Sequence, residues 1–270
     1  MPLRRSYWVY AKDFSVSKVS GRFKLVVDGE AREVAAERTG LLAFKGDGWI
    51  SSEALMLAYE KGTQIVVLGP RPVWIWLKPS RDVKYFLGLY SSDVDLGRRF
   101  VEDFALDCAR FFRRRGVALP EDLNIDEAAV KLLQGLRGFL VRFFSERLGV
   151  DAGWVVGLAA ILRGFLEAEA ISFLCEAGLD PGYMLEMGVP LYHFFAAGFE
   201  FPVVWKTLSD LRGSYHVGAE LGNAVQVRPI LRIAKSNLEA VRRGHSVREW
   251  MRRKAFSIAS SLSNPLTGVE

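Results

Sequence analysis

The sequence predicts an α+β protein: a β-rich N-terminal domain with one short helix, followed by an all-helical C-terminal domain. Short apolar and β-branched segments, separated by turn residues, fill residues 1–90. Beyond residue 90 the apolar residues recur with the 3.6-residue period of helices. Half of the 270 residues are hydrophobic, which excludes a disordered chain. We expect the β-rich domain to comprise residues 1–85 and the helical domain residues 86–270.

The N-terminal domain contains six segments with strand character. We expect strands over 6–11, 22–27, 32–35, 41–44, 64–68 and 73–77. The pair Asp28-Gly29 predicts a hairpin turn between the second and third of these strands. Ser51 and Ser52 offer an N-cap for a short helix near 52–61, and Gly62 offers a left-handed C-terminal cap.

The C-terminal domain reads as a series of amphipathic and apolar helices. We expect helices over 96–115, 126–148, 152–177, 226–243 and 246–262, with short helical pieces at 183–187, 191–197 and 202–211. The segment 152–177 is almost entirely apolar, which predicts a central, buried helix. No charge-free apolar run reaches 18 residues, so we expect no membrane span.

Charge is distributed unevenly along the chain. The net charge is +5, and residues 227–270 hold nine basic and three acidic side chains. A basic C-terminal segment invites an anionic partner such as nucleic acid. The N-terminus carries no apolar signal sequence, and two cysteines favour reduced thiols, so we expect a cytoplasmic protein. Four Asn and three Gln are few, which fits a thermophilic source.

Two carboxylates stand out in the apolar segment 152–177. Glu167 and Glu169 are two residues apart and therefore face different sides of a helix. A buried carboxylate needs a cation, an arginine partner such as Arg163, or a proton. His193 lies in an apolar stretch, where we expect a hydrogen-bonded core histidine. The sequence contains no phosphate-binding glycine loop, zinc-binding Cys/His spacing or nucleophile elbow.

Three stretches together resemble one known family. Residues 50–68 form a helix-then-strand segment, Glu169 precedes a Gly-Leu-Asp-Pro turn at 178–181 by nine residues, and 246–255 is a basic helix. These stretches and their order resemble the spacer-acquisition integrases of CRISPR antiviral defence, the Cas-one family. The resemblance implies a metal-dependent DNA endonuclease and integrase, with Mg²⁺ or Mn²⁺ as its cofactor. It also implies a homodimer formed through the β-rich domains.

The family's metal ligands are mostly replaced in this chain. The family holds the metal with a Glu, a His and an Asp; the Glu maps onto Glu169, the His position onto Met187 and the Asp position onto Phe195. A Met or Phe side chain cannot hold a hard divalent cation, which prefers oxygen ligands. Either the site is lost, or it is rebuilt from the neighbouring candidates Glu186, His193 and Glu200.

The sequence therefore leaves two functions open. One is a CRISPR adaptation protein with the family's metal-dependent DNA cleavage and integration. The other is a catalytically silent DNA-binding subunit that partners an active paralogue or other adaptation proteins, such as a Cas-two-like subunit. In a silent subunit we expect Met187 and Phe195 to fill the metal's volume, and an arginine from the last two helices to pair with Glu169.

In either case, DNA contacts are expected from the basic C-terminal region. The candidate residues are Arg242, Arg243, Arg248, Arg252, Arg253 and Lys254. Arg248, Arg252 and Arg253 share one face of the predicted last helix, since they stand at i, i+4 and i+5. Arginines on one face suit phosphate contacts. A solvated basic helix without a nucleic-acid role is the remaining alternative.

Overall fold

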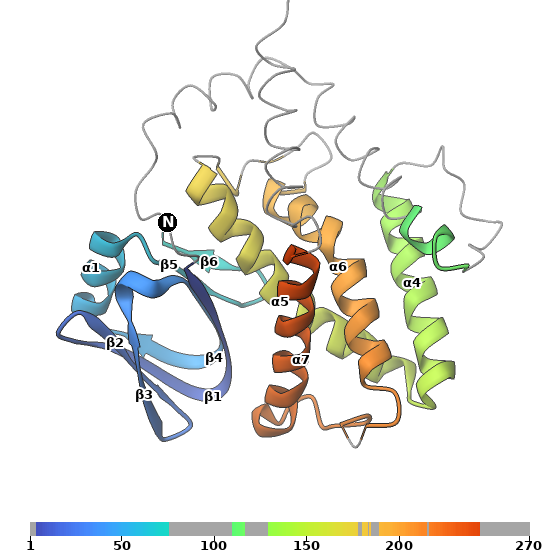
Figure 1. Ribbon diagram of the computed structural model, residues 1–270, viewed down its shortest axis with the longest axis horizontal. Coiled ribbons are helices and arrows are strands. Elements are labelled where there is room, and N and C mark those ends of the chain that lie inside the picture. The colour runs from blue at the N-terminus through green and yellow to red at the C-terminus, as the bar shows by residue number, and fades with distance from the viewer. Residues whose placement is uncertain are drawn as a thin grey trace, which may run out of the picture.

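A computed structural model describes residues 4–75, 110–116, 129–177, 180–182, 184, 189–214 and 216–243. A mixed six-stranded sheet in the order β3-β2-β1-β4-β5-β6 forms the N-terminal part (Figure 1). Strand β4 is parallel to its neighbours β1 and β5, and the other pairs are antiparallel. The strands are β1 (Arg5–Val19), β2 (Arg22–Val27), β3 (Glu30–Ala35), β4 (Thr39–Ile50), β5 (Gln64–Val67) and β6 (Val73–Trp74).

The predicted turn and helix caps of this part are confirmed. Asp28 and Gly29 have φ angles of 49° and 85°, the left-handed backbone of a tight hairpin turn between β2 and β3. Helix α1 (Ser52–Lys61) begins where the Ser51 hydroxyl accepts a hydrogen bond from the Ala54 amide. It ends at Gly62 with a φ of 62°. A 3₁₀ turn, η1 (Ala36–Arg38), joins β3 to β4.

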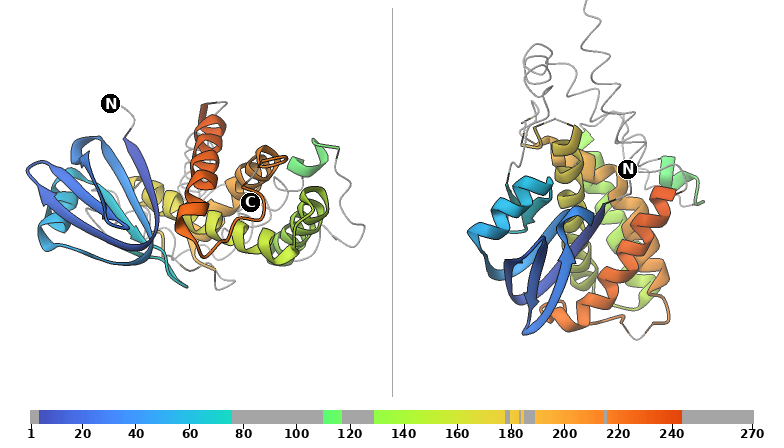
Figure 2. Two further views of the ribbon diagram at one scale, coloured as in Figure 1. Left: turned by 90° about the horizontal axis from the view of Figure 1, so that it is seen from below. Right: turned by 60° about the vertical axis from the view of Figure 1, so that its left-hand side comes forward.

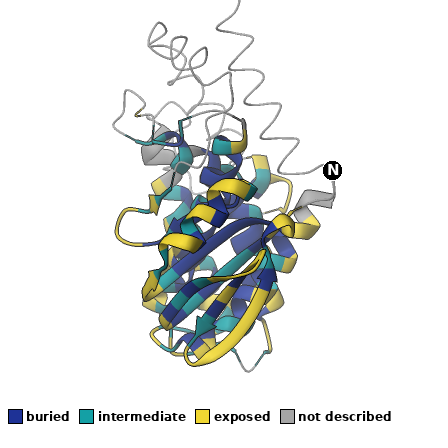
Figure 3. Cartoon of the chain, turned by 90° about the vertical axis from the view of Figure 1, so that its left-hand side faces the viewer, coloured by how far each residue is buried: buried dark blue, intermediate teal, exposed yellow. Residues whose placement is uncertain are grey.

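The sheet is buried on both faces along β4. Leu42 and Phe44 pack in one apolar core with α1, while Leu41 and Ala43 pack in a second core with the helical part. This alternation follows from the two-residue period of a strand. The outer strand β3 and the outer side of α1 are largely exposed (Figure 3).

Four long helices form the described C-terminal part. They are α4 (Ala129–Leu148), α5 (Ala152–Ala177), α6 (Leu191–Asp210) and α7 (Ala224–Arg243). Helix α5 contacts α4, α6 and strands β4 and β5, which makes it the central helix that the sequence predicts. Helix α7 lies against β1, so the sheet and the helices stand side by side with α7 at their junction (Figure 2).

The α+β fold class is confirmed, and the structure corrects one helix. The predicted pieces 191–197 and 202–211 are one continuous helix, α6, with Pro202 in its interior. An interior proline costs about 3 kcal/mol, but Phe199, Phe201 and Val203 around it are fully buried. Each buried apolar side chain contributes about 1.5–3 kcal/mol, so packing outweighs the missing backbone hydrogen bond.

Other predicted elements differ in length or fall outside the description. Strands β1 and β4 extend well beyond the predicted 6–11 and 41–44. The predicted helix 246–262, the piece 183–187 and most of 96–115 lie outside the described residues. Among the helices of the described ranges, none is long and apolar enough to cross a membrane.

Candidate metal centre and nucleic-acid interface

Glu169 is buried at the junction of the two parts of the molecule. Its side chain projects from α5, and the residue is 5% exposed. Its Oε1 accepts a hydrogen bond of 2.9 Å from the indole Nε1 of Trp8 on β1. The Trp8 ring stacks on Phe165, one turn earlier on α5, at 5.2 Å between ring centres. The carboxylate that the resemblance assigns to a metal thus accepts a hydrogen bond from a side chain of the sheet.

Sequence reasoning missed Trp8 as a partner of Glu169. The two residues are 161 positions apart. The arginine from the last two helices that we expect beside Glu169 stays a prediction, because the predicted helix 246–262 lies outside the described residues. Arg163, the other arginine that the sequence suggests, pairs elsewhere. The sequence pointed to Trp8 only through the aromatic residues of the first strand. Such residues indicate that a strand is buried, but they do not identify the side chains that it contacts.

Glu167 faces a different neighbour from Glu169, as their spacing predicts. Its Oε1 lies 2.8 Å from Nδ1 of His193 on α6. A carboxylate only accepts hydrogen bonds, so the imidazole donates through Nδ1–H. His193 is therefore a hydrogen-bonded histidine between α5 and α6, and it is joined to Glu167 rather than to Glu169.

Glu200 is the most deeply buried of the candidate carboxylates that the structure describes. It is 2% exposed and accepts hydrogen bonds from Arg137 on α4, at 2.6 and 3.2 Å, and from Nε of Arg163 on α5, at 2.9 Å. Nη2 of Arg163 forms a further ion-pair contact of 2.8 Å with Oε1 of Glu200. Burial alone would raise the pKa of the Glu200 carboxyl, but the two guanidinium groups outweigh burial and lower it. The ionised carboxylate ties α4, α5 and α6 together.

The described residues do not fit the metal that the resemblance implies. Phe195, which the resemblance places at the family's Asp position, is fully buried and stacks with Phe173 at 6.2 Å between ring centres. Glu200 is already neutralised by two arginines, and Glu169 accepts from Trp8. In the described ranges no group of three or more His, Cys, Asp or Glu side chains could hold a metal ion. Glu186 and Met187 lie outside the described residues.

The expected DNA contacts fall at and beyond the end of α7. Arg242 and Arg243 are the last two residues of that helix. Arg248, Arg252, Arg253 and Lys254 lie outside the described residues. In sequence, the basic segment begins directly after α7. Helix α7 lies against the sheet, so the predicted DNA contacts come next to the junction of the sheet and the helices.

A set of polar contacts fixes α7 and the preceding loop to the sheet. The Tyr10 hydroxyl donates to the Leu221 carbonyl at 2.8 Å, and burial raises the pKa of this phenol. Arg228 forms an ion pair with Asp28 in the hairpin turn. Lys235 donates to the Ser6 carbonyl on β1. Charged residues in an amphipathic helix do not reveal from sequence whether they face water or another domain, so this role was missed.

Comparisons with known proteins identify the fold. The chain is similar to TM1797, a Cas1 protein from Thermotoga maritima, with a TM-score of 0.75, 12% identity and coverage of 98% of this chain and 100% of that one. It is also similar to a casposase bound to its integration product, with a TM-score of 0.61, 15% identity and coverage of 88% and 83%.

A third relative by structure is TtCas1. Its structure alone matches with a TM-score of 0.60, 17% identity and coverage of 97% and 98%, and its DNA complex with a TM-score of 0.51, 17% identity and coverage of 98% and 93%. No family model matches the sequence, and no curated protein does. The resemblance seen in the sequence is thus confirmed at the level of fold: the chain has the fold of Cas1 proteins.

Proposed function

We propose that this protein is a Cas1-like DNA-binding subunit of CRISPR adaptation that has given up the family's metal-dependent chemistry. The proposal rests on one observation: the carboxylates near the expected metal position already have hydrogen-bond partners within the protein. Glu169 accepts a hydrogen bond from Trp8, and Glu200 is held by Arg137 and Arg163. By the resemblance, Phe195 takes the position of the family's aspartate, and its ring is fully buried.

DNA is the proposed partner for two reasons. TtCas1 was solved in a DNA complex, and the casposase was solved on its integration product. The chain also carries nine basic and three acidic residues over 227–270, which favours phosphate contacts. By resemblance, the protein assembles as a homodimer through the sheet domain, with a Cas-two-like subunit or an active paralogue as its further partner.

A metal-dependent integrase is the second candidate. One observation favours it: α5 and α6 bring the Glu167 carboxylate and the His193 imidazole within 2.8 Å of each other, close in sequence to Glu169. Glu and His are two of the three ligand types that the family uses. In that case Mg²⁺ or Mn²⁺ would supply the Lewis acid that activates a hydroxyl and stabilises the phosphate undergoing attack.

The discriminating experiment measures DNA binding and DNA cleavage together. We expect the purified protein to bind branched DNA but to show no cleavage or integration in Mg²⁺ or Mn²⁺. The variant Glu169→Gln keeps an oxygen that can accept from Trp8 while removing the charge that a metal needs, so we expect it to bind DNA like the wild type.

Metal-dependent cleavage by the wild type that disappears in Glu169→Gln would contradict the silent subunit and support the metal-dependent integrase. The electron paramagnetic resonance spectrum of Mn²⁺ supplies an independent readout, since bound and free Mn²⁺ give different signals. Stoichiometric Mn²⁺ binding that Glu169→Gln or His193→Ala abolishes would also contradict the silent subunit. Circular dichroism of both variants shows that a loss is not caused by unfolding.

A further inference from the structure

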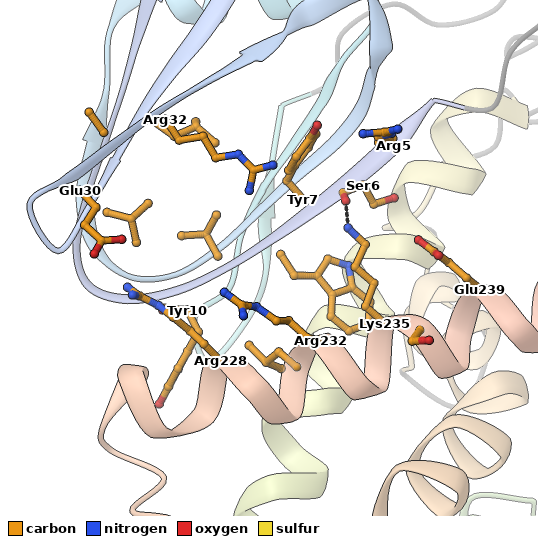
Figure 4. A pocket seen from close by; sticks show the side chains of 17 residues that line it. Arg5, Ser6, Tyr7, Tyr10, Glu30, Arg32, Arg228, Arg232, Lys235 and Glu239 are labelled. Carbon is orange, nitrogen blue, oxygen red and sulfur yellow. Dashed lines mark hydrogen bonds between the residues drawn. The ribbon is translucent and has the colours of Figure 1, made fainter. Parts of the chain in front are cut away.

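A basic cleft runs between the sheet and α7. Its volume is about 850 Å³. One wall is formed by β1 and the β2–β3 hairpin, and the other by α7 (Figure 4). The lining contains five basic and two acidic residues: Arg5, Arg32, Arg228, Arg232, Lys235, Glu30 and Glu239.

The basic side chains of the cleft come from both walls. Figure 4 shows Arg228, Arg232 and Lys235 reaching from α7 toward the sheet, and Arg32 reaching from β3 into the same space. Glu30 and Glu239 lie toward opposite ends of the row. Cations that converge from two walls, in a partly desolvated cleft, create a stronger field than the same charges on a flat surface.

The structure holds several of these cations in place. Arg32 lies 5.6 Å and Lys235 5.4 Å from the centre of the Tyr7 ring, in cation–π geometry. Arg228 pairs with Asp28 and anchors one end of the cleft. A ligand that meets fixed charges loses less free energy to side-chain ordering.

Two further arginines are exposed. Arg5 and Arg232 form no ion pair or hydrogen bond through their side chains with the described residues. They can therefore contact an anion without first breaking an internal contact. Apolar residues such as Val27 and Leu231 complete the lining, which suits the sugar or base of a nucleotide.

We propose that this cleft binds a single-stranded segment of nucleic acid, with its phosphates lying along the basic side chains of α7 and the sheet. The proposal rests on the DNA-binding function proposed above and assigns one surface and one form of DNA to it. A volume of 850 Å³ lies within the range of pockets for small ligands, about 300–1,000 Å³. It accommodates a few unpaired nucleotides, whereas a base-paired duplex, with two strands and their paired bases, is too bulky to enter a cleft of this volume.

The chain's own C-terminal segment is a poorer occupant on charge. Residues 244–270 hold four basic and two acidic side chains. Like charges repel this segment from a basic cleft, while the same segment and the cleft attract nucleic acid together. Charge complementarity thus favours a nucleic-acid strand over this part of the protein.

The test compares one cleft variant with a matched control. The double variant Arg5→Glu with Arg232→Glu reverses two exposed charges of the cleft. The control, Arg142→Glu with Arg212→Glu, makes the same charge change at exposed positions on α4 and after α6, outside the cleft lining. Fluorescence anisotropy measures binding of a labelled ten-nucleotide oligothymidine and of a duplex of equal length.

We expect the cleft variant to lose about tenfold or more in affinity for the single strand and about threefold or less for the duplex. The slope of log affinity against log salt for the single strand falls by about 1.4, because two phosphate contacts are lost. The control variant retains the wild-type slope. If the double reversal unfolds the protein, Arg5→Gln with Arg232→Gln tests the same contacts with a smaller charge change.

Equal losses for both DNA forms, or a single-strand affinity that matches the control, would overturn the cleft proposal while leaving DNA binding intact. Failure of the wild type to bind any DNA would instead overturn the proposed function. A nucleoside triphosphate serves as competitor: displacement of the strand at about equimolar triphosphate would assign the cleft to a free nucleotide and contradict a strand site.

Discussion

At the scale of single residues, Glu200 shows how the helical part uses a buried charge. Its carboxylate is 3% exposed, while the side chains of Arg137 and Arg163 are 21% and 26% exposed. Removal of the carboxylate leaves two guanidinium groups facing each other without their counter-charge. We expect Glu200→Ala to lower the free energy of unfolding by about 3 kcal/mol, measured by urea denaturation. The exposed Glu146→Ala on α4 is the control, and an equal effect there would contradict this role.

The same carboxylate predicts a dependence of stability on pH. Because the pKa of Glu200 is lower in the folded protein than its ordinary value near 4.3, folding favours the ionised form. Its stabilising contribution is present above about pH 4.3 and is lost as the pH falls toward the lower folded pKa. We expect the difference in unfolding free energy between wild type and Glu200→Gln to shrink over this interval. A constant difference from pH 6 to pH 3 would contradict the assignment.

Trp8 provides the second prediction about an individual contact. The variant Trp8→Phe keeps an aromatic ring against Phe165 but removes the N–H that donates to Glu169. The loss of a hydrogen bond to a buried carboxylate should cost about 1–3 kcal/mol. Thermal and urea unfolding measure this cost. Trp49, which is 60% exposed, supplies the matched control Trp49→Phe, for which we expect a change within about 0.5 kcal/mol.

At the scale of elements, Gly46 makes room for the pairing of β4 with β1. The register shifts between Tyr10 and Asp13, so β1 has an extra residue opposite Gly46. Gly46 has a φ of 138°, and a Cβ there would lie 1.9 Å from the Ala11 carbonyl oxygen. We expect Gly46→Ala to destabilise the protein by about 2 kcal/mol or more. The control Gly21→Ala, with open space around its Cβ, should change stability by less than about 1 kcal/mol.

The elements also show what local sequence can and cannot predict. Strand β2 and helix α5 have the predicted bounds, because their patterns of apolar residues and their flanking turns agree. Helix α6 was predicted in two pieces because Pro202 is a strong local signal. The packing that keeps this helix continuous comes from other helices. The long C-terminal half of β1 was missed because pairing with β2 and β4 defines it.

At the scale of the whole molecule, the contacts between the sheet and the helices could not be predicted from the sequence. The order of the two parts followed from the change of hydrophobic period. The contacts that join them, such as Trp8 with Glu169 and Tyr10 with Leu221, link residues more than 150 positions apart. The expectation that Phe195 replaces a metal ligand rests on the resemblance alone. The partners of Glu169 and Glu200 required the folded structure.

The junction between the sheet and the helices also predicts which parts of the molecule contact DNA. Helix α7 lines the cleft and ends at Arg243, and the chain then continues into the basic segment with Arg252 and Arg253. Two sites on one continuous length of chain should each contact a different part of a branched DNA. We expect Arg252→Glu with Arg253→Glu to weaken binding of duplex and branched DNA by about tenfold or more, and to lower the salt slope for duplex by about 1.8.

Combining the two sets of variants separates their roles. We expect Arg252→Glu with Arg253→Glu to affect duplex DNA and Arg5→Glu with Arg232→Glu to affect the single strand. On branched DNA, which presents both forms, the fourfold variant should lose about the sum of the two losses in binding free energy, because independent sites are additive. Titrations of the three DNA forms at several salt concentrations measure this. Duplex affinity that is unchanged in Arg252→Glu with Arg253→Glu would show that the C-terminal basic segment is a solvated surface, and the cleft alone would then have to account for DNA binding.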